Sequence, residues 1–339
     1  MFVREAHTTP NKDSSSTAGN TLARFLAVPE VGVICALVLV VAFFYSFEHA
    51  FLSPRNVRSM LNIVSFVGII AIGQTILLIS GEFDLSVGSI AGLGAVVSAK
   101  LMTAAGLPVP FAILLGISVG GLIGVLNGVV VVLLHIPAFI QTLGMLFVGQ
   151  GLIQVVTGGY PIYPLPDGIT SLGSTPIAVG LGWSFFFFLA AASFADFILR
   201  QTVVGRNLYA TGGNVQVARL VGINTSLYRI GAFFLVGILS ATAGILEMAD
   251  LGSGSTGIGS GWELSVIAGV VVGGVSLFGG VGSVVGGLFG ILLLQAVQSG
   301  LVSIGVSANW QQIAVGLIMI FAVGLDTWRR RLFSSGGTG

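Results

Sequence analysis

Apolar residues fill ten long runs of this chain, and polar residues are confined to the breaks between them. A helix needs roughly 20 apolar residues to cross a hydrocarbon core of about 30 Å. The pattern therefore predicts an all-α, polytopic membrane protein of about ten transmembrane helices, with broken or re-entrant helices among them. The third, fifth and eighth runs are the weakest candidates for full spans. The runs are 31–47, 61–79, 85–101, 109–134, 137–156, 177–199, 227–246, 264–277, 281–301 and 310–325.

Composition excludes a water-soluble protein. Of 339 residues, 55% are hydrophobic and 7% are charged, whereas an ordinary soluble domain has roughly 25% charged residues. The apolar runs follow one another with few polar breaks, which favours a single membrane domain over residues 31–328. The polar residues 1–30 are expected to form a disordered cytoplasmic tail, and residues 329–339 a cytoplasmic C-terminal tail. The single thiol, Cys35, supports neither a disulfide nor redox chemistry.

Basic residues predict the orientation, because cytoplasmic loops are enriched in Lys and Arg. With ten spans and both termini in the cytoplasm, only Arg55, Arg58 and Lys100 of the thirteen basic residues lie outside. The ten that lie inside are Arg4, Lys12, Arg24, Arg200, Arg206, Arg219, Arg229, Arg329, Arg330 and Arg331. We therefore expect both termini on the cytoplasmic side.

Glycines and one short repeat give information on packing. Gly116, Gly120, Gly124 and Gly128 recur every four residues, as do Gly282, Gly286 and Gly290, which is typical of closely packed membrane helices. The sequence FDLSV at 83–87 resembles WELSV at 262–266, and each opens a glycine-rich run. With ten spans the two lie on opposite faces of the membrane, which predicts an inverted repeat.

The motifs of several enzyme classes are missing. The chain has no HExxH and no GxxxxGK[ST] sequence, so a zinc-protease or nucleotide-binding site is not expected here. We also expect no metal site and no cofactor in this chain. If ATP drives the protein, a separate subunit binds ATP and Mg²⁺.

Polar residues inside the apolar runs are the candidates for a solute pathway, since amides and hydroxyls exchange hydrogen bonds with a neutral hydroxylated solute. Hydrogen bonding between helices is the structural alternative for each of them. For the acids Asp84 and Glu263 the alternative is stabilisation of a helix N-terminus. The candidates are Gln74, Asp84, Ser86, Asn127, Gln141, Gln150, Glu263, Ser265, Gln295 and Gln298.

The polar segment 200–229 is the most distinctive stretch. Residues 215–221 predict a short helix bracketed by Gly212-Gly213 and Gly222. One or two turns of helix are marginally stable in water, so the segment is expected to dock on a partner.

Four motifs carry a resemblance to a known family. GRNLYATGGNVQVARLVGIN (205–224) resembles the coupling segment of the sugar permeases of ATP-binding-cassette importers, of the ribose, xylose and galactose type. Within it, Gln216, Ala218 and Gly222 resemble the EAA-x-x-x-G loop that inserts into the ATPase. GEFDLSVGS (81–89), Asn127-Gly128 and PAFIQTLG (137–144) resemble further segments of the family. The resemblance covers about 56–325.

The resemblance implies a permease subunit that is not an enzyme and lies in a bacterial inner membrane. Its implied partners are an ATPase with two nucleotide-binding halves, an extracytoplasmic sugar-binding protein and a second permease subunit, identical or paralogous, but no nucleic acid. The residues implied for ATPase coupling are Gly205, Arg206, Gly212, Gly213, Asn214, Gln216, Ala218, Arg219 and Gly222.

This sequence departs from the family at three positions. Gln216 replaces the first acid of the EAA motif, Phe83 stands where an aliphatic residue is usual, and Glu82 adds an acid. A branched-chain amino-acid or nucleoside permease remains an alternative. An ion-coupled secondary transporter is a further one, and it would need buried ionisable groups to bind its coupling ion.

Overall fold

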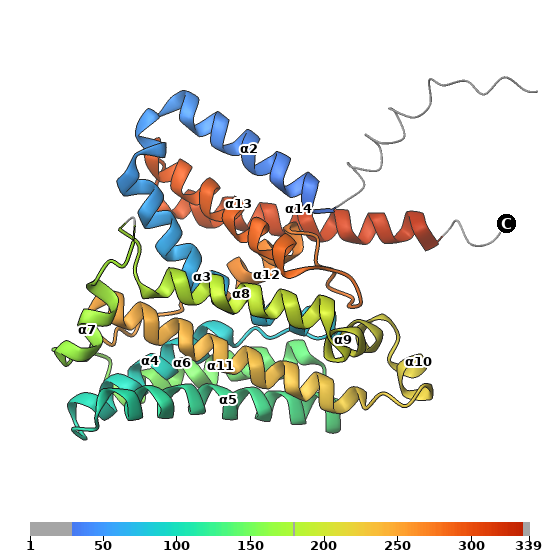
Figure 1. The fold of residues 1–339 in the computed structure, drawn as a ribbon, viewed down its shortest axis with the longest axis horizontal. Coiled ribbons are helices and arrows are strands. Elements are labelled where there is room, and N and C mark those ends of the chain that lie inside the picture. Colours follow the sequence, from blue (N-terminus) through green and yellow to red (C-terminus); the bar gives the residue numbers. More distant parts are fainter. Residues whose placement is uncertain (1–28, 179, 335–339) are drawn as a thin grey trace, which may run out of the picture.

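The computed structural model describes residues 29–178 and 180–334, and its regular elements in this part are helices (Figure 1). The predicted tails fall mostly outside it, except that Pro29 and Glu30 open the first described helix and residues 329–334 end the last. The helices are α2 (Pro29–Phe47), η1 (His49–Leu52), α3 (Pro54–Ile79), α4 (Val87–Thr103), α5 (Val109–Leu133), α6 (Ala138–Thr157), α7 (Asp167–Ser174), α8 (Trp183–Gln201), α9 (Val203–Gly213), α10 (Val215–Leu220), α11 (Thr225–Leu251), α12 (Trp262–Val272), α13 (Val284–Ser303) and α14 (Ala308–Ser334).

Each of the ten predicted apolar runs corresponds to one helix. Among the described residues, seven helices are long and apolar enough to cross a membrane: α2, α3, α5, α6, α8, α11 and α13. The predicted weakness of the third and eighth runs is confirmed, because α4 has 17 residues and α12 has 11. The predicted weakness of the fifth run is wrong, since α6 has 20 residues, which is the length of a full span.

Polar residues define where several helices begin. Ser53 accepts a hydrogen bond from the N–H of Asn56 at the start of α3, and Pro54 occupies the first turn, where no N–H is needed. Asn224 caps α11 through the N–H of Leu227, and Ser283 caps α13 through that of Gly286. These caps satisfy amides that have no partner within their own helix.

Long helices cross between the two halves of the bundle, of which the first contains α3, α4 and α5 and the second contains α11, α12 and α13. α3 packs against α12 and α13 of the second half, and α11 packs against α4 and α5 of the first. The bundle has an end that carries α7 and an opposite end that carries α9 and α10, called here the α7 end and the α10 end (Figure 1). The 83–87 segment lies in the linker that enters α4 from the α10 end, whereas 262–266 follows a linker from the α7 end. This arrangement agrees with the predicted inverted repeat.

The glycine lines make close helix packing possible. A Cβ at Gly120 or Gly124 would overlap the backbone of α11, and Gly237 of α11 meets the Gly120 carbonyl in return. In the second line, Gly286 and Gly290 pack against the backbone of α12. Gly282 does not belong to that line, because it lies before α13 with φ at 144°.

Candidate functional site

The N-terminal ends of the two short helices meet inside the bundle. A side chain at Gly88, in the first turn of α4, would overlap the Gly259 carbonyl and would lie against the carboxylate of Glu263 at the start of α12. The linker 252–261 runs back along α4, with Gly254 against Ala99 near the other end of that helix. Helix N-termini carry free N–H groups and the positive end of the helix dipole. Both short helices therefore present backbone donors to one region.

A cavity of about 430 Å³ opens next to this meeting point. Small-molecule sites usually have volumes of roughly 300–1,000 Å³. Among the described residues that line the cavity none is charged, and its polar wall consists of hydroxyls and amides from α4, α6 and the linker 252–261. These side chains are Ser89, Gln150, Gln154, Thr256 and Ser260. Such a wall suits a neutral ligand that both donates and accepts hydrogen bonds.

Four of the predicted pathway residues join in one hydrogen-bond chain. Asp84 Oδ1 accepts hydrogen bonds from the Ser86 N–H at 2.6 Å and from the Ser86 hydroxyl at 2.5 Å. Asp84 Oδ2 accepts one from Asn127 Nδ2 at 3.1 Å, and Asn127 Oδ1 accepts one from Gln141 Nε2 at 3.1 Å. Asp84, Ser86 and Asn127 are fully buried. The chain of bonds fixes the start of α4 to α5 and α6, and its members do not line the cavity.

An ion pair holds the same linker to the other half of the protein. Glu82 bonds to Arg229 in the second turn of α11, and both side chains are largely shielded from solvent. Burial of a charged pair is favourable only when the partners compensate each other closely. The linker 80–86 is therefore fixed both to α5 and to α11.

The remaining pathway candidates lie in α3, α12 and α13, and they belong neither to the hydrogen-bond chain nor to the cavity wall. Gln74 is fully buried in α3, and neither atom of its amide has a hydrogen-bond partner among the described residues. Ser265 of α12 and Gln295 and Gln298 of α13 are half-buried. The sequence analysis did not single out Gln154, Thr256 or Ser260, because they lie at a span end or in a polar linker rather than within an apolar run.

The predicted short helix is present as α10. Asn214 caps it by accepting hydrogen bonds from the N–H groups of Gln216 and Val217, both at 3.0 Å. Ala218 is its one buried residue. At the far end, Gly222 has φ at 85°, a conformation that favours glycine, which ends the helix sharply.

The other residues predicted for coupling have two kinds of surroundings. Arg206, Gly213 and Gln216 are exposed, whereas Arg219 donates through Nε to the Thr225 hydroxyl at 2.9 Å. Gly205 and Gly212 face inward, where a side chain would overlap the backbone of α8 and of the end of α3, respectively. α10 also exposes the apolar side chain of Leu220, which has 85% of its surface accessible.

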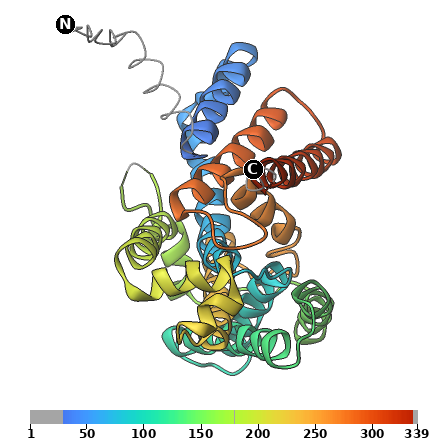
Figure 2. The same cartoon turned by 90° about the vertical axis from the view of Figure 1, so that its right-hand side faces the viewer.

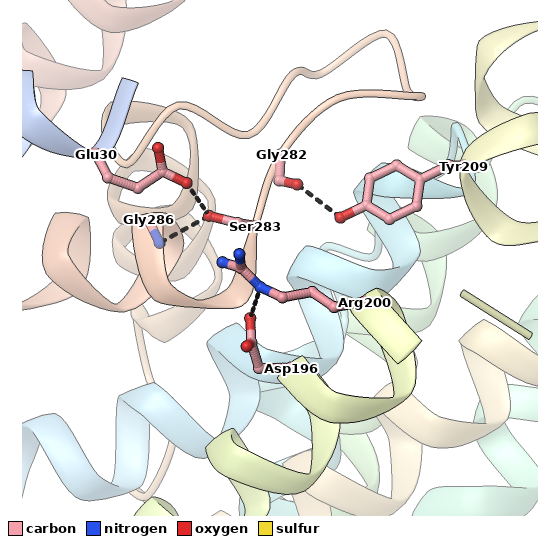
Figure 3. Close-up of polar contacts among 7 residues, drawn as sticks. All are labelled: Glu30, Asp196, Arg200, Tyr209, Gly282, Ser283 and Gly286. Atoms are coloured by element: carbon pink, nitrogen blue, oxygen red, sulfur yellow. Dashed lines mark hydrogen bonds and ion pairs between the residues drawn. The ribbon is translucent and has the colours of Figure 1, made fainter. Parts of the chain in front are cut away.

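Polar contacts tie α9 and α2 to the loop that precedes α13 (Figure 3). The Tyr209 hydroxyl donates to the Gly282 carbonyl at 2.7 Å, and burial raises the pKa of this phenol, which keeps it protonated. The Ser283 hydroxyl donates to Glu30 at 2.7 Å. Nearby, Arg200 bonds to Asp196 within α8. The loop 273–283 is thus held between α9 and the start of α2.

Comparisons with known proteins agree with this architecture. The chain is 34% identical to the galactose/methyl galactoside import permease protein MglC of Escherichia coli K12, over 88% of this chain and 94% of that protein. It is 35% identical to the autoinducer 2 import system permease protein LsrC of Salmonella typhi, over 88% of this chain and 85% of that protein. For LsrC of Photorhabdus luminescens the identity is also 35%, over 88% and 89% of the two chains. No solved structure matches the chain.

Residues 56–323 match a family model described as branched-chain amino acid transport system / permease component. This range contains both short helices, the cavity, the linker 80–86 and α10. The chain is a multi-pass inner-membrane transport subunit and not an enzyme. Because the match spans most of the sequence, the protein belongs to the family of permease components of ATP-binding-cassette importers.

Proposed function

We propose that the protein carries a neutral, polyhydroxylated solute of the monosaccharide or polyol class across the membrane. The observation that carries this proposal is the uncharged wall of amides and hydroxyls around the 430 Å³ cavity. A zwitterionic amino acid would require paired charges for its ammonium and carboxylate groups. The names of the relatives support the proposal, since they import galactose, methyl galactoside or autoinducer 2.

Removal of one cavity amide tests the proposal. Gln154→Leu leaves a solute hydroxyl without its partner, and we expect uptake to fall by roughly tenfold, as for a lost hydrogen bond of about 1.4 kcal/mol. The measurement is uptake of a labelled monosaccharide by vesicles that contain the permease, its ATPase and its binding protein. Gln201→Leu, at the exposed end of α8, is the control. Leucine uptake that exceeds monosaccharide uptake would contradict the proposed solute class.

We also propose how the partners are arranged. An ATPase with two nucleotide-binding halves holds ATP and Mg²⁺ and docks on α10, while a solute-binding protein approaches the α7 end. A second permease subunit completes the assembly. The support is the exposure of Val217 and Leu220 on a helix of six residues and of Val221 directly after it, because apolar side chains on so short a helix need a covering partner. We therefore propose that the α10 end, with the end of α14, lies in the cytoplasm, and the distribution of basic residues supports this orientation.

Loss of the apolar contact tests the docking. Leu220→Asp introduces a charge into the proposed interface, and we expect at least roughly tenfold less ATPase to co-purify with the permease. Gln216→Glu adds the same charge to the same helix at the position where the family motif carries an acid, so this variant should retain the ATPase. Membrane insertion should be equal in both. Normal ATPase recovery with Leu220→Asp would show that α10 is not the docking element, and it would remove one support for the proposed orientation.

A further inference from the structure

Three backbone segments meet at the last turn of α9. A methyl group at Gly212 would overlap the carbonyl of Ile79, the last residue of α3. A Cβ built on Gly279 would lie 2.7 Å from the Gly212 carbonyl oxygen and 2.8 Å from the Cα of Gly81. A Cβ on Gly280 would lie 2.7 Å from the Cα of Gly213. At this joint α9, the end of α3 and the loop 273–283 approach within backbone contact, which side chains would prevent.

Hydrogen bonds fix the same three segments to one another. The Gly280 N–H donates to the Ile79 carbonyl at 2.9 Å, so the loop is bonded directly to the end of α3. The Tyr209 hydroxyl donates to the Gly282 carbonyl, which bonds the loop to α9 (Figure 3). The joint is therefore a bonded unit and not only a place of close approach.

The position of the joint connects α9 to both short helices. The linker that starts at the joint with Gly81 enters α4 and carries Glu82 and Asp84. The loop 273–283 starts where α12 ends and passes through the joint at Gly280. On its other side α9 continues through the Asn214 cap into α10, so a displacement of α10 reaches the joint through a few residues of backbone. Figure 2 shows α9 and α10, in olive and yellow, at this end of the bundle.

We propose that the last turn of α9 acts as a single lever, which displaces the N-terminal end of α4 and the C-terminal end of α12 together. Gly212 is the residue that positions this lever. The proposal rests on the proposed docking of an ATPase at α10, and it adds the route by which that motion reaches the solute cavity. α4 and α12 meet beside the cavity through Gly88, Gly259 and Glu263. A coupled shift of the N-terminal end of α4 and the C-terminal end of α12 would change the cavity from both halves of the protein at once.

Gly212→Ala is the direct test. The added methyl forces α9 away from the Ile79 carbonyl while α10 and its exposed face are unchanged. We expect normal ATPase co-purification, but about tenfold weaker stimulation of ATP hydrolysis by solute-loaded binding protein and a similar loss of uptake. Gly231→Ala is the matched control, since Gly231 is also a helical glycine near the α10 end and a Cβ there meets nothing within 4 Å. It should behave as the unaltered chain.

A milder variant tests the same proposal in case Gly212→Ala does not fold. Tyr209→Phe keeps the ring and removes only the hydroxyl that bonds Gly282, and we expect about a threefold loss of stimulated hydrolysis with normal ATPase recovery. The lever proposal is wrong if Gly212→Ala keeps the stimulation of ATP hydrolysis within about twofold of the control. If Gly212→Ala does not fold, unchanged stimulation in Tyr209→Phe overturns the proposal instead. Loss of ATPase recovery in Gly212→Ala would also overturn it, because the residue would then act in docking. Failure of the docking proposal itself appears separately, in the Leu220→Asp variant.

Discussion

Glu82→Gln is expected to destabilise the protein by about 3–5 kcal/mol, because it leaves a buried guanidinium without its compensating charge. The side chains of Arg229 and Glu82 are only 19% and 9% exposed, the ion pair is made by Arg229 Nη2, and Arg229 Nε has no hydrogen-bond partner among the described residues. The pair also connects the linker 80–86 to α11. The loss should appear as a lower midpoint of thermal unfolding in detergent and as a lower yield of folded permease.

The chain supplies a matched control for this change. Asp196→Asn breaks an ion pair of similar chemistry in α8, but Arg200 and Asp196 are 51% and 27% exposed, so the expected cost is below about 1 kcal/mol. Replacing both partners, in Glu82→Gln with Arg229→Met, should recover part of the stability because no unpaired charge remains. Equal unfolding midpoints for Glu82→Gln and Asp196→Asn would show that the buried pair does not hold the linker.

Gly120→Leu should be strongly damaging within the membrane helices, at a cost of about 3 kcal/mol or more. At Gly120 the backbones of α5 and α11 touch, and Gly237 faces it from α11, so neither helix can yield without losing its packing along the whole contact. Gly144→Leu makes the same change in α6, where a Cβ meets nothing within 4 Å.

The measurement is the fraction of monodisperse permease after extraction in mild detergent, followed by thermal unfolding. Gly120→Leu should aggregate or unfold early, whereas Gly144→Leu should resemble the unaltered chain. If both variants survived extraction equally, close packing of α5 on α11 would not be what holds the two halves together.

Much of the fold could be predicted from local patterns. Hydropathy located ten helices, seven of which are long and apolar enough to cross a membrane among the described residues, since burial in lipid acts on each run separately. The glycine spacing at 116–128 indicated close packing, and Gly212, Gly213 and Gly222 indicated the ends of a short helix. The likeness of FDLSV to WELSV indicated two related halves, because each segment lies at the start of a short helix.

The tertiary relations could not be predicted in this way. The sequence analysis noted Glu82 as an added acid and Arg229 as one of the cytoplasmic basic residues, but nothing local shows that residues 147 positions apart form a pair. Gln154 and Thr256 line one cavity only because the linker 252–261 folds back along α4. Gly212 was identified as a surface coupling residue, whereas its contact with Ile79 depends on where three distant segments meet.

The exchange of long helices between the halves determines the order in which the protein can fold during synthesis. α3 packs against α8, α11, α12 and α13, all of which leave the ribosome after it, and its residues from Val64 to Ile79 are buried in the finished protein. Before the second half is inserted into the bilayer, the amide of Gln74 and the hydroxyl of Thr75 have only lipid or transient neighbours. Tertiary folding is therefore completed only when the last helices arrive, and a chain stopped before α11 exposes polar groups by which membrane quality control can recognise it as unfinished.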